Sequence, residues 1–199
     1  VDALDNVFLL GSLFGSETID YGGGPLVGIG SYDIVIAKLD SSGNHLWSKR
    51  FGDASLQGAG DIGVDASNNL LVTGAFQGTL SFGFNSVTNV AGAGTNLFIA
   101  KLSGVDGASI WAHQYGDTSD QGGSKIAIDA LGNFAVAGTL TGTLSLGASS
   151  LVGTGVGGDF FVARFNTLGN STCAAMLDAS SPGAWLKGIA LNTAGELIV

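Results

Sequence analysis

One acidic residue returns at a matching place in each copy of a repeated segment. Asp53 and Asp117 follow glycine in FGD and YGD, Asp178 stands in LDA, and Gln57 and Gln121 accompany the first two. Carboxylates on a loop can bind Ca²⁺, but this ion takes roughly six to eight oxygen ligands, more than one such segment supplies. An aspartate that caps a turn or joins two units also recurs at a fixed register. We favour this structural role, and Asp53, Asp117 and Asp178 remain the candidate metal ligands.

A second recurring aspartate lies in an Asp-Ala step. Asp2, Asp65 and Asp129 each begin a short polar segment such as DASNN or DALGN. Aspartate at the start of a turn, followed by glycine or asparagine where the backbone turns left-handed, is typical of a tight connection between strands. We predict that these three residues cap turns.

Nucleotide binding is not predicted, although residues 58–63 read GAGDIG and match the pattern GxGxxG. A dinucleotide site needs a helix after the glycines, whereas strand and turn residues follow here. The counterpart at residues 122–127 loses the pattern.

The two histidines do not form a repeating ligand set. His45 lies two residues before Trp47, whereas His113 lies two residues after Trp111. Lone histidines in strands are expected to be structural rather than metal ligands.

Catalytic motifs are missing from the sequence. It contains no GxSxG, no HExxH and no recognisable set of serine, histidine and aspartate. We therefore predict no enzyme, no catalytic residue and no cofactor, with calcium kept as a possibility. The alternatives are a carbohydrate-active hydrolase or lyase, which could place two carboxylates on loops, and a calcium-dependent binding module.

The composition limits the partners. The 199 residues are 45% hydrophobic and 12% charged, with 34 Gly and a net charge of −9. The negative charge argues against nucleic acid as a partner. No apolar run is long enough for a transmembrane segment. One cysteine, Cys173, rules out a disulfide within the chain.

These candidate residues lie in an internal repeat of about 64 residues. QGTLSFG at residues 77–83 returns as TGTLSLG at residues 141–147. We place the units at residues 1–63, 64–127 and 128–190, with a fourth beginning at 191–199, all within a single domain.

Each unit predicts β-structure throughout, because short runs of Val, Ile, Phe and Trp alternate with Gly, Asn and Asp. The expected strands are residues 61–65 (equivalent to 125–129), 70–76, 97–102 and 110–115, with an extra hairpin over residues 78–90. We predict an all-β chain of about three β-propeller blades, each a four-stranded antiparallel sheet with that hairpin, in an incomplete ring. The weaker alternative is a β-solenoid.

The repeat resembles a known bacterial family. VDASNNLLVTGAFQGTL, followed by FIAKL, a tryptophan and YGD, is similar to the SBBP-type propeller repeat and the related delta-60 repeat. This resemblance implies an interaction scaffold in a large secreted or surface-attached bacterial protein, without shared catalytic residues. It also implies a protein or glycan partner, or further blades from the same chain or from homo-oligomer neighbours.

The tryptophans carry a second resemblance. Ser103 to Trp111 has a spacing similar to the tryptophan-docking motif of quinoprotein propellers. We expect Trp47 and Trp111 to be largely buried between neighbouring sheets at equivalent positions, with Cys173 or Met176 in the corresponding space of the third unit. Three units cannot close a ring of four to eight blades, so we expect a segment of a longer propeller or of an assembly.

Overall fold

All regular structure in the described chain is β-strand. The computed structural model describes residues 1–89, 94–147, 149–153, 158–177, 186–192 and 196–198. Within these ranges there is no helix, and accordingly none long and apolar enough to cross a membrane.

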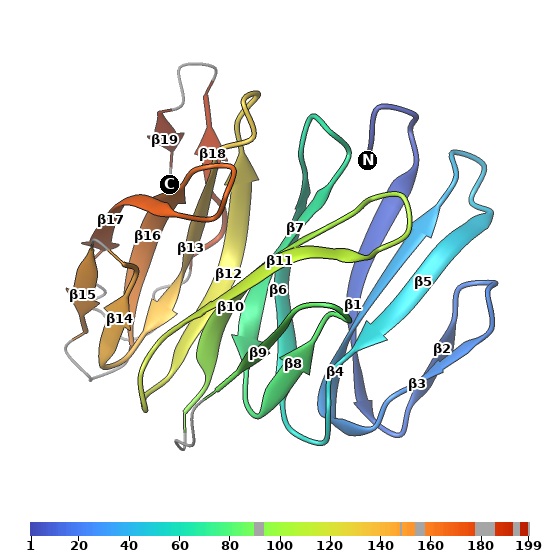
Figure 1. Ribbon diagram of the computed structural model, residues 1–199, viewed down its shortest axis with the longest axis horizontal. Coiled ribbons are helices and arrows are strands. Elements are labelled where there is room, and N and C mark those ends of the chain that lie inside the picture. The colour runs from blue at the N-terminus through green and yellow to red at the C-terminus, as the bar shows by residue number, and fades with distance from the viewer. Residues whose placement is uncertain (90–93, 148, 154–157, 178–185, 193–195, 199) are drawn as a thin grey trace.

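Three antiparallel sheets lie side by side with their faces in contact (Figure 1). The first sheet holds β1 (Val7–Gly15), β4 (Gly30–Leu39) and β5 (His45–Phe51). The second holds β6 (Gln57–Val64), β7 (Leu70–Phe76), β10 (Asn96–Leu102) and β11 (Ser109–Tyr115). The third holds β12 (Gln121–Ile128), β13 (Phe134–Leu140), β16 (Asp159–Phe165) and β17 (Ser171–Leu177).

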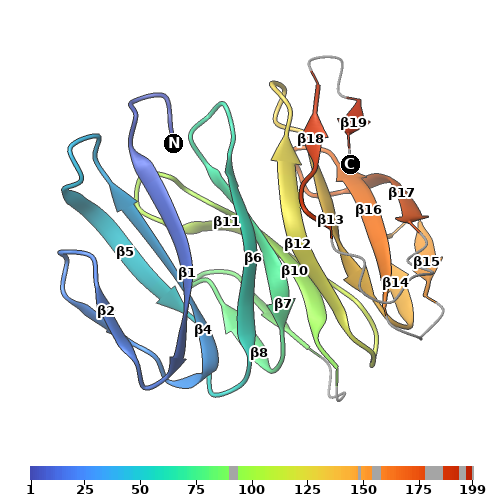
Figure 2. The same cartoon turned by 180° about the vertical axis from the view of Figure 1, so that it is seen from behind.

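In each sheet the strands follow one another in chain order, interrupted once by a small hairpin. Strands β6 and β12 lie on the side of the stack seen in Figure 2, and β5, β11 and β17 lie on the opposite side (Figure 1). The hairpins are β2–β3 (Thr18–Asp20, Pro25–Val27), β8–β9 (Thr79–Ser81, Ser86–Thr88) and β14–β15 (Thr143–Ser145, Ser150–Val152). A last pair joins β18 (Ala190–Leu191) to β19 (Leu197–Ile198).

The second sheet is buried on both faces, which explains its nearly continuous apolar strands. Leu70 and Val72 of β7 face the first sheet, whereas Leu71 between them faces the third. Val72 is fully buried and Leu71 is 1% exposed. One strand therefore supplies side chains to two cores.

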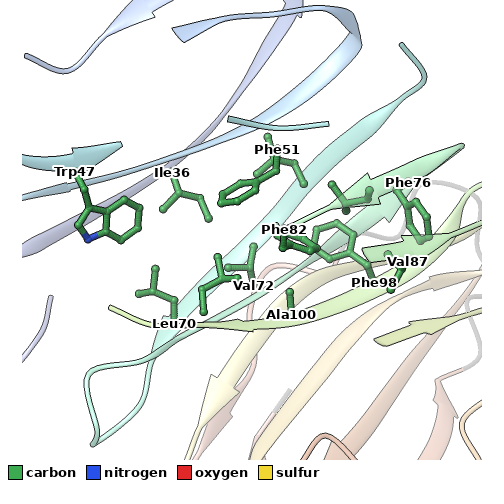
Figure 3. Packing of buried hydrophobic residues seen from close by; sticks show 13 residues of the cluster. Ile36, Trp47, Phe51, Leu70, Val72, Phe76, Phe82, Val87, Phe98 and Ala100 are labelled. Atoms are coloured by element: carbon green, nitrogen blue, oxygen red, sulfur yellow. The ribbon is translucent and has the colours of Figure 1, made fainter. Parts of the chain in front are cut away.

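Each core fills the space between two neighbouring sheets. Figure 3 shows the core between the first and second sheets, where Ile36 and Phe51 meet Val72 and Phe98. Phe82 follows strand β8, and its ring centroid lies 5.1 Å from that of Phe51 and 5.8 Å from that of Phe98. The hairpin thus packs against the preceding sheet.

The predicted fold is confirmed at the level of an all-β chain of small antiparallel sheets with extra hairpins. Strand β7 has the predicted bounds, and β10 and β11 each begin one residue earlier than expected. The first strand of the second and third sheets begins earlier still, at Gln57 and Gln121, so these sheets start before the repeat boundaries drawn from the sequence. The first sheet has three strands, and the described residues form no closed ring.

Candidate functional sites

The recurring Asp117 forms a closed set of hydrogen bonds with Gln121. Its Oδ1 accepts the backbone N–H of Ser119 at 2.8 Å and a side-chain N–H of Gln121 at 2.8 Å. Its Oδ2 accepts the N–H of Thr143 at 2.7 Å. Gln121 in turn accepts the N–H of Asp117 and donates to the carbonyl of Thr141. The carboxylate therefore ties the loop before β12 to the hairpin β14–β15.

The same arrangement surrounds Asp53 one unit earlier. Its oxygens accept N–H groups of Ser55 at 2.7 Å, Gln57 at 2.7 Å and Thr79 at 2.8 Å. Burial by itself would raise the pKa of Asp53, but these hydrogen bonds outweigh it and hold the pKa below its ordinary value. The geometry is that of a cap linking a loop to a hairpin.

Of the three candidate metal ligands, the structure places two, and it does not bring them together. Asp53 and Asp117 belong to different units, and both oxygens of each already accept hydrogen bonds. Asp178 lies outside the described residues. Within the described ranges no three His, Cys, Asp or Glu side chains gather as a metal site.

The Asp-Ala aspartates cap the turns that join successive strands. Oδ1 of Asp129 accepts the N–H groups of Leu131 and Asn133, both at 2.9 Å. Gly132 within this turn has a left-handed φ of 82°, and the equivalent Asn68 and Asp5 have φ of 60° and 59°. Asx turns of this kind explain why aspartate and then glycine or asparagine recur.

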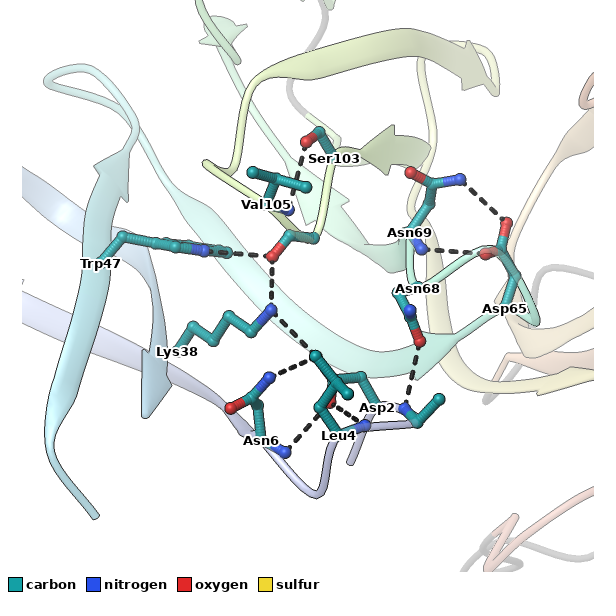
Figure 4. Close-up of polar contacts among 12 residues, drawn as sticks. Asp2, Leu4, Asn6, Lys38, Trp47, Asp65, Asn68, Asn69, Ser103 and Val105 are labelled. Atoms are coloured by element: carbon teal, nitrogen blue, oxygen red, sulfur yellow. Dashed lines mark hydrogen bonds and ion pairs between the residues drawn. The ribbon is translucent and has the colours of Figure 1, made fainter. Parts of the chain in front are cut away.

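Two of these turns also hold a lysine from the same sheet. Lys38 Nζ lies 2.9 Å from Asp2 Oδ2 (Figure 4). Lys101 Nζ lies 2.7 Å from Asp65 Oδ2. Burial opposes ionisation of Asp2, but hydrogen bonds from Asn6 and Lys38 hold its pKa well below the usual range. Lys38 also donates to the carbonyl of Gly104 at 2.9 Å, which links the first sheet to the second.

Trp47 docks on the second unit, as predicted from its spacing. It is 9% exposed, and its indole N–H donates to the carbonyl of Gly104 at 3.3 Å (Figure 4). A side chain on Gly107 would come within 3.0 Å of the indole ring, so glycine is needed at this contact.

Trp111 makes the corresponding contact with Gly169 of the third unit but is only half-buried. Cys173, which occupies the matching position in β17, is exposed, and Met176 is half-buried. Burial at this position therefore decreases from the first sheet to the third.

The histidines lie in different settings, as their unequal positions predict. His45 Nε2 lies 3.0 Å from Ser48 Oγ within the first sheet. His113 lies between the rings of Trp111 and Tyr115, at centroid distances of 4.9 and 6.4 Å. Burial raises the pKa of Tyr115 to about 12, and its hydroxyl donates to the carbonyl of Gly169 at 3.0 Å. This aromatic row borders a hollow of about 420 Å³.

The GxGxxG segment lies within strand β6, where its glycines serve sheet packing. A side chain on Gly60 would collide with the carbonyl of Gly123 in β12, so glycine permits this close approach. The neighbouring Asp61 Oδ2 accepts the N–H of Ile126 across the same contact at 3.0 Å. This segment is not a loop that could hold a phosphate.

Sequence reasoning missed one position at which the units differ. In the first sheet, buried Asp33 accepts a hydrogen bond from Arg50 at 2.9 Å. The second sheet has Asn96 and Gln114 at the same register, beside a hollow of about 340 Å³. A residue-by-residue comparison of the repeats would have revealed this substitution of amides for an ion pair.

No protein-family model matches the chain, and neither does any curated protein sequence.

Proposed function

We propose that the chain is a non-enzymatic interaction scaffold that acts outside the cell or at a bacterial cell surface. The observation that carries this proposal is that the recurring polar residues form hydrogen bonds and ion pairs within the fold. Asp53, Asp117 and Lys38 all point their charged groups at partners within the fold. A side chain held in this way stabilises the repeat, and the exposed outer surface of the sheets is left to bind a partner. The SBBP-like sequence pattern supports the extracellular setting.

We also propose that the stacked sheets are propeller blades. Four strands in chain order, with the first strands of neighbouring sheets side by side, are typical of that architecture. Cys173 and Ala175 of β17 are exposed at the outer face of the third sheet, which supports additional blades from the same chain or from a neighbouring copy. Light scattering on this chain, together with the mass of the native polypeptide, tests whether additional blades are present. A monomeric chain whose native polypeptide contains no further blades would contradict the proposal.

The test of the scaffold function is a binding screen run beside an activity screen. The 199-residue chain is applied to arrays of glycans and of extracellular proteins, and separately to glycoside hydrolase and lyase substrates. Saturable binding without turnover supports the proposal, whereas turnover of any substrate contradicts it.

Calcium is not required in this proposal, because Asp53 and Asp117 already accept hydrogen bonds from N–H groups. Binding and thermal stability are expected to be equal in excess EDTA and in calcium. A rise in melting temperature on adding calcium would favour the calcium-dependent binding module instead.

A further inference from the structure

An arginine fills a defined position in the first sheet. Asp33 is fully buried, and its Oδ1 accepts a hydrogen bond from Arg50 Nη1 at 2.9 Å. The same nitrogen donates to the carbonyl of Gly52 at 3.2 Å. A guanidinium group thus satisfies both a carboxylate and a backbone oxygen where β5 ends.

The second sheet has the same geometry without the arginine. Ile34 pairs with Phe51, and Leu97 pairs with Tyr115. The residues before them in each strand are therefore equivalent: Asp33 corresponds to Asn96, and Arg50 corresponds to Gln114.

The shorter Gln114 leaves a hollow of about 340 Å³, lined by Asn96, Gln114, Asp117 and Ser145 among others. Asn96 is 5% exposed, and its Oδ1 is buried without a hydrogen-bond donor. Gln114 Oε1 is buried without a donor as well. Asn96 and Gln114 both line the hollow, and two buried acceptors there without donors favour a ligand that supplies N–H groups.

We propose that this hollow binds the guanidinium group of an arginine side chain presented by a partner protein. The group would donate to Asn96 Oδ1 and Gln114 Oε1, as Arg50 donates to Asp33 in the first sheet. This inference deepens the proposed binding function and rests on it.

The chemistry of the hollow favours a guanidinium group over a bare metal ion. A guanidinium presents several N–H donors in a fixed plane and can reach two acceptors at once. Calcium needs roughly six or more oxygens, whereas the oxygens of Asp117 already accept N–H groups. None of the described residues that line the hollow is Lys, Arg or His, and the net charge of −9 attracts a cation.

The experiment titrates the 199-residue chain with Nα-acetyl-arginine amide and follows the side-chain amide signals of Asn96 and Gln114 by NMR. The neutral citrulline analogue serves as the matched ligand, because it keeps the shape and loses the charge. We expect saturable shifts at both amides with the arginine probe, and an affinity about tenfold weaker for the citrulline probe. Equal affinities, or no saturable shift at these amides, would overturn the proposal.

A double variant, Asn96→Asp with Gln114→Arg, recreates the ion pair of the first sheet inside the hollow. It is expected to fold, to melt no lower than the parent chain and to lose the arginine probe. Leu131→Arg is the control, because it adds an arginine at an exposed turn residue outside the hollow and should retain binding. Unchanged binding by the double variant would refute the site, and the NMR result on the parent chain decides the matter if the variant does not fold.

The outcomes separate this site from the scaffold function. A native partner that binds the parent chain and the double variant equally would leave the scaffold function intact and reject the guanidinium site. If the arginine probe binds saturably and the chain also turns over a substrate at another place, the scaffold function is rejected and the guanidinium site is retained.

Discussion

Replacing Trp47 by alanine tests the docking of the first sheet on the second. Trp47 is 9% exposed, its ring centroid lies 6.1 Å from that of Phe8, and its indole N–H bonds to Gly104. Truncation of a buried aromatic residue costs about 3–5 kcal/mol. The carbonyl of Gly104 keeps Lys38 as a donor, so the variant leaves no orphaned acceptor, and we expect the lower half of this range.

Two companion variants separate packing from hydrogen bonding. Trp47→Phe keeps most of the apolar contact and loses the indole N–H, so it should cost about 1–2 kcal/mol. Trp111→Ala should cost less than Trp47→Ala, because Trp111 is only half-buried. Urea unfolding followed by circular dichroism measures all three. A loss below about 1 kcal/mol for Trp47→Ala, or a larger loss for Trp111→Ala, would refute the docking argument.

Three further predictions concern turns and titration. Asp5 adopts a left-handed φ of 59°, so Asp5→Gly should raise the free energy of unfolding by about 0.5–1 kcal/mol in urea; a loss would show that the aspartate side chain stabilises the turn. The folded-state pKa of Asp117 lies below the ordinary 3.8, so its contribution should persist above about pH 4 and disappear as the pH falls through the folded pKa. In the Asp117→Asn variant, the melting temperature should fall less as the pH is lowered. An unchanged dependence of the melting temperature on acidic pH would contradict the hydrogen bonds described for the Asp117 carboxylate. Burial raises the pKa of Tyr115 to about 12, so the stability from its neutral phenol should be lost as the pH rises from about 10 towards 12. Tyr115→Phe should reduce that alkaline loss, and an identical alkaline profile would contradict the burial of the hydroxyl.

The sequence predicted the strands whose residues carry a strong local preference. Leu70–Phe76 was predicted with the observed bounds because its apolar residues face cores on both sides of the sheet. The turns at Asp65 and Asp129 were predicted because an Asx turn depends on a few consecutive residues. These strands and turns could therefore be predicted because they depend on residues that are close together in the sequence.

The missed features depend on contacts between distant residues. The first four residues of β6, from Gln57 to Gly60, lie outside the strand predicted at residues 61–65, because glycine has a low strand propensity. They form a strand because they pair with residues 74–76 of β7, and glycine at position 60 leaves room for the close approach of β12. The hollow beside Asn96 and Gln114 was missed because it depends on the pairing of β10 with β11 and on the absence of an arginine.

The position of Phe82 has a consequence for how the chain acquires its structure. This residue belongs to the second unit, yet its ring fills the core between that unit and the first. The same core needs Phe98 and Leu102 from β10. The first sheet can therefore bury its apolar face only after synthesis has passed Leu102, and a single unit cut from the chain should not fold alone. We expect the smallest unit that folds independently to be a pair of neighbouring sheets, so this repeat should gain or lose stability one interface at a time.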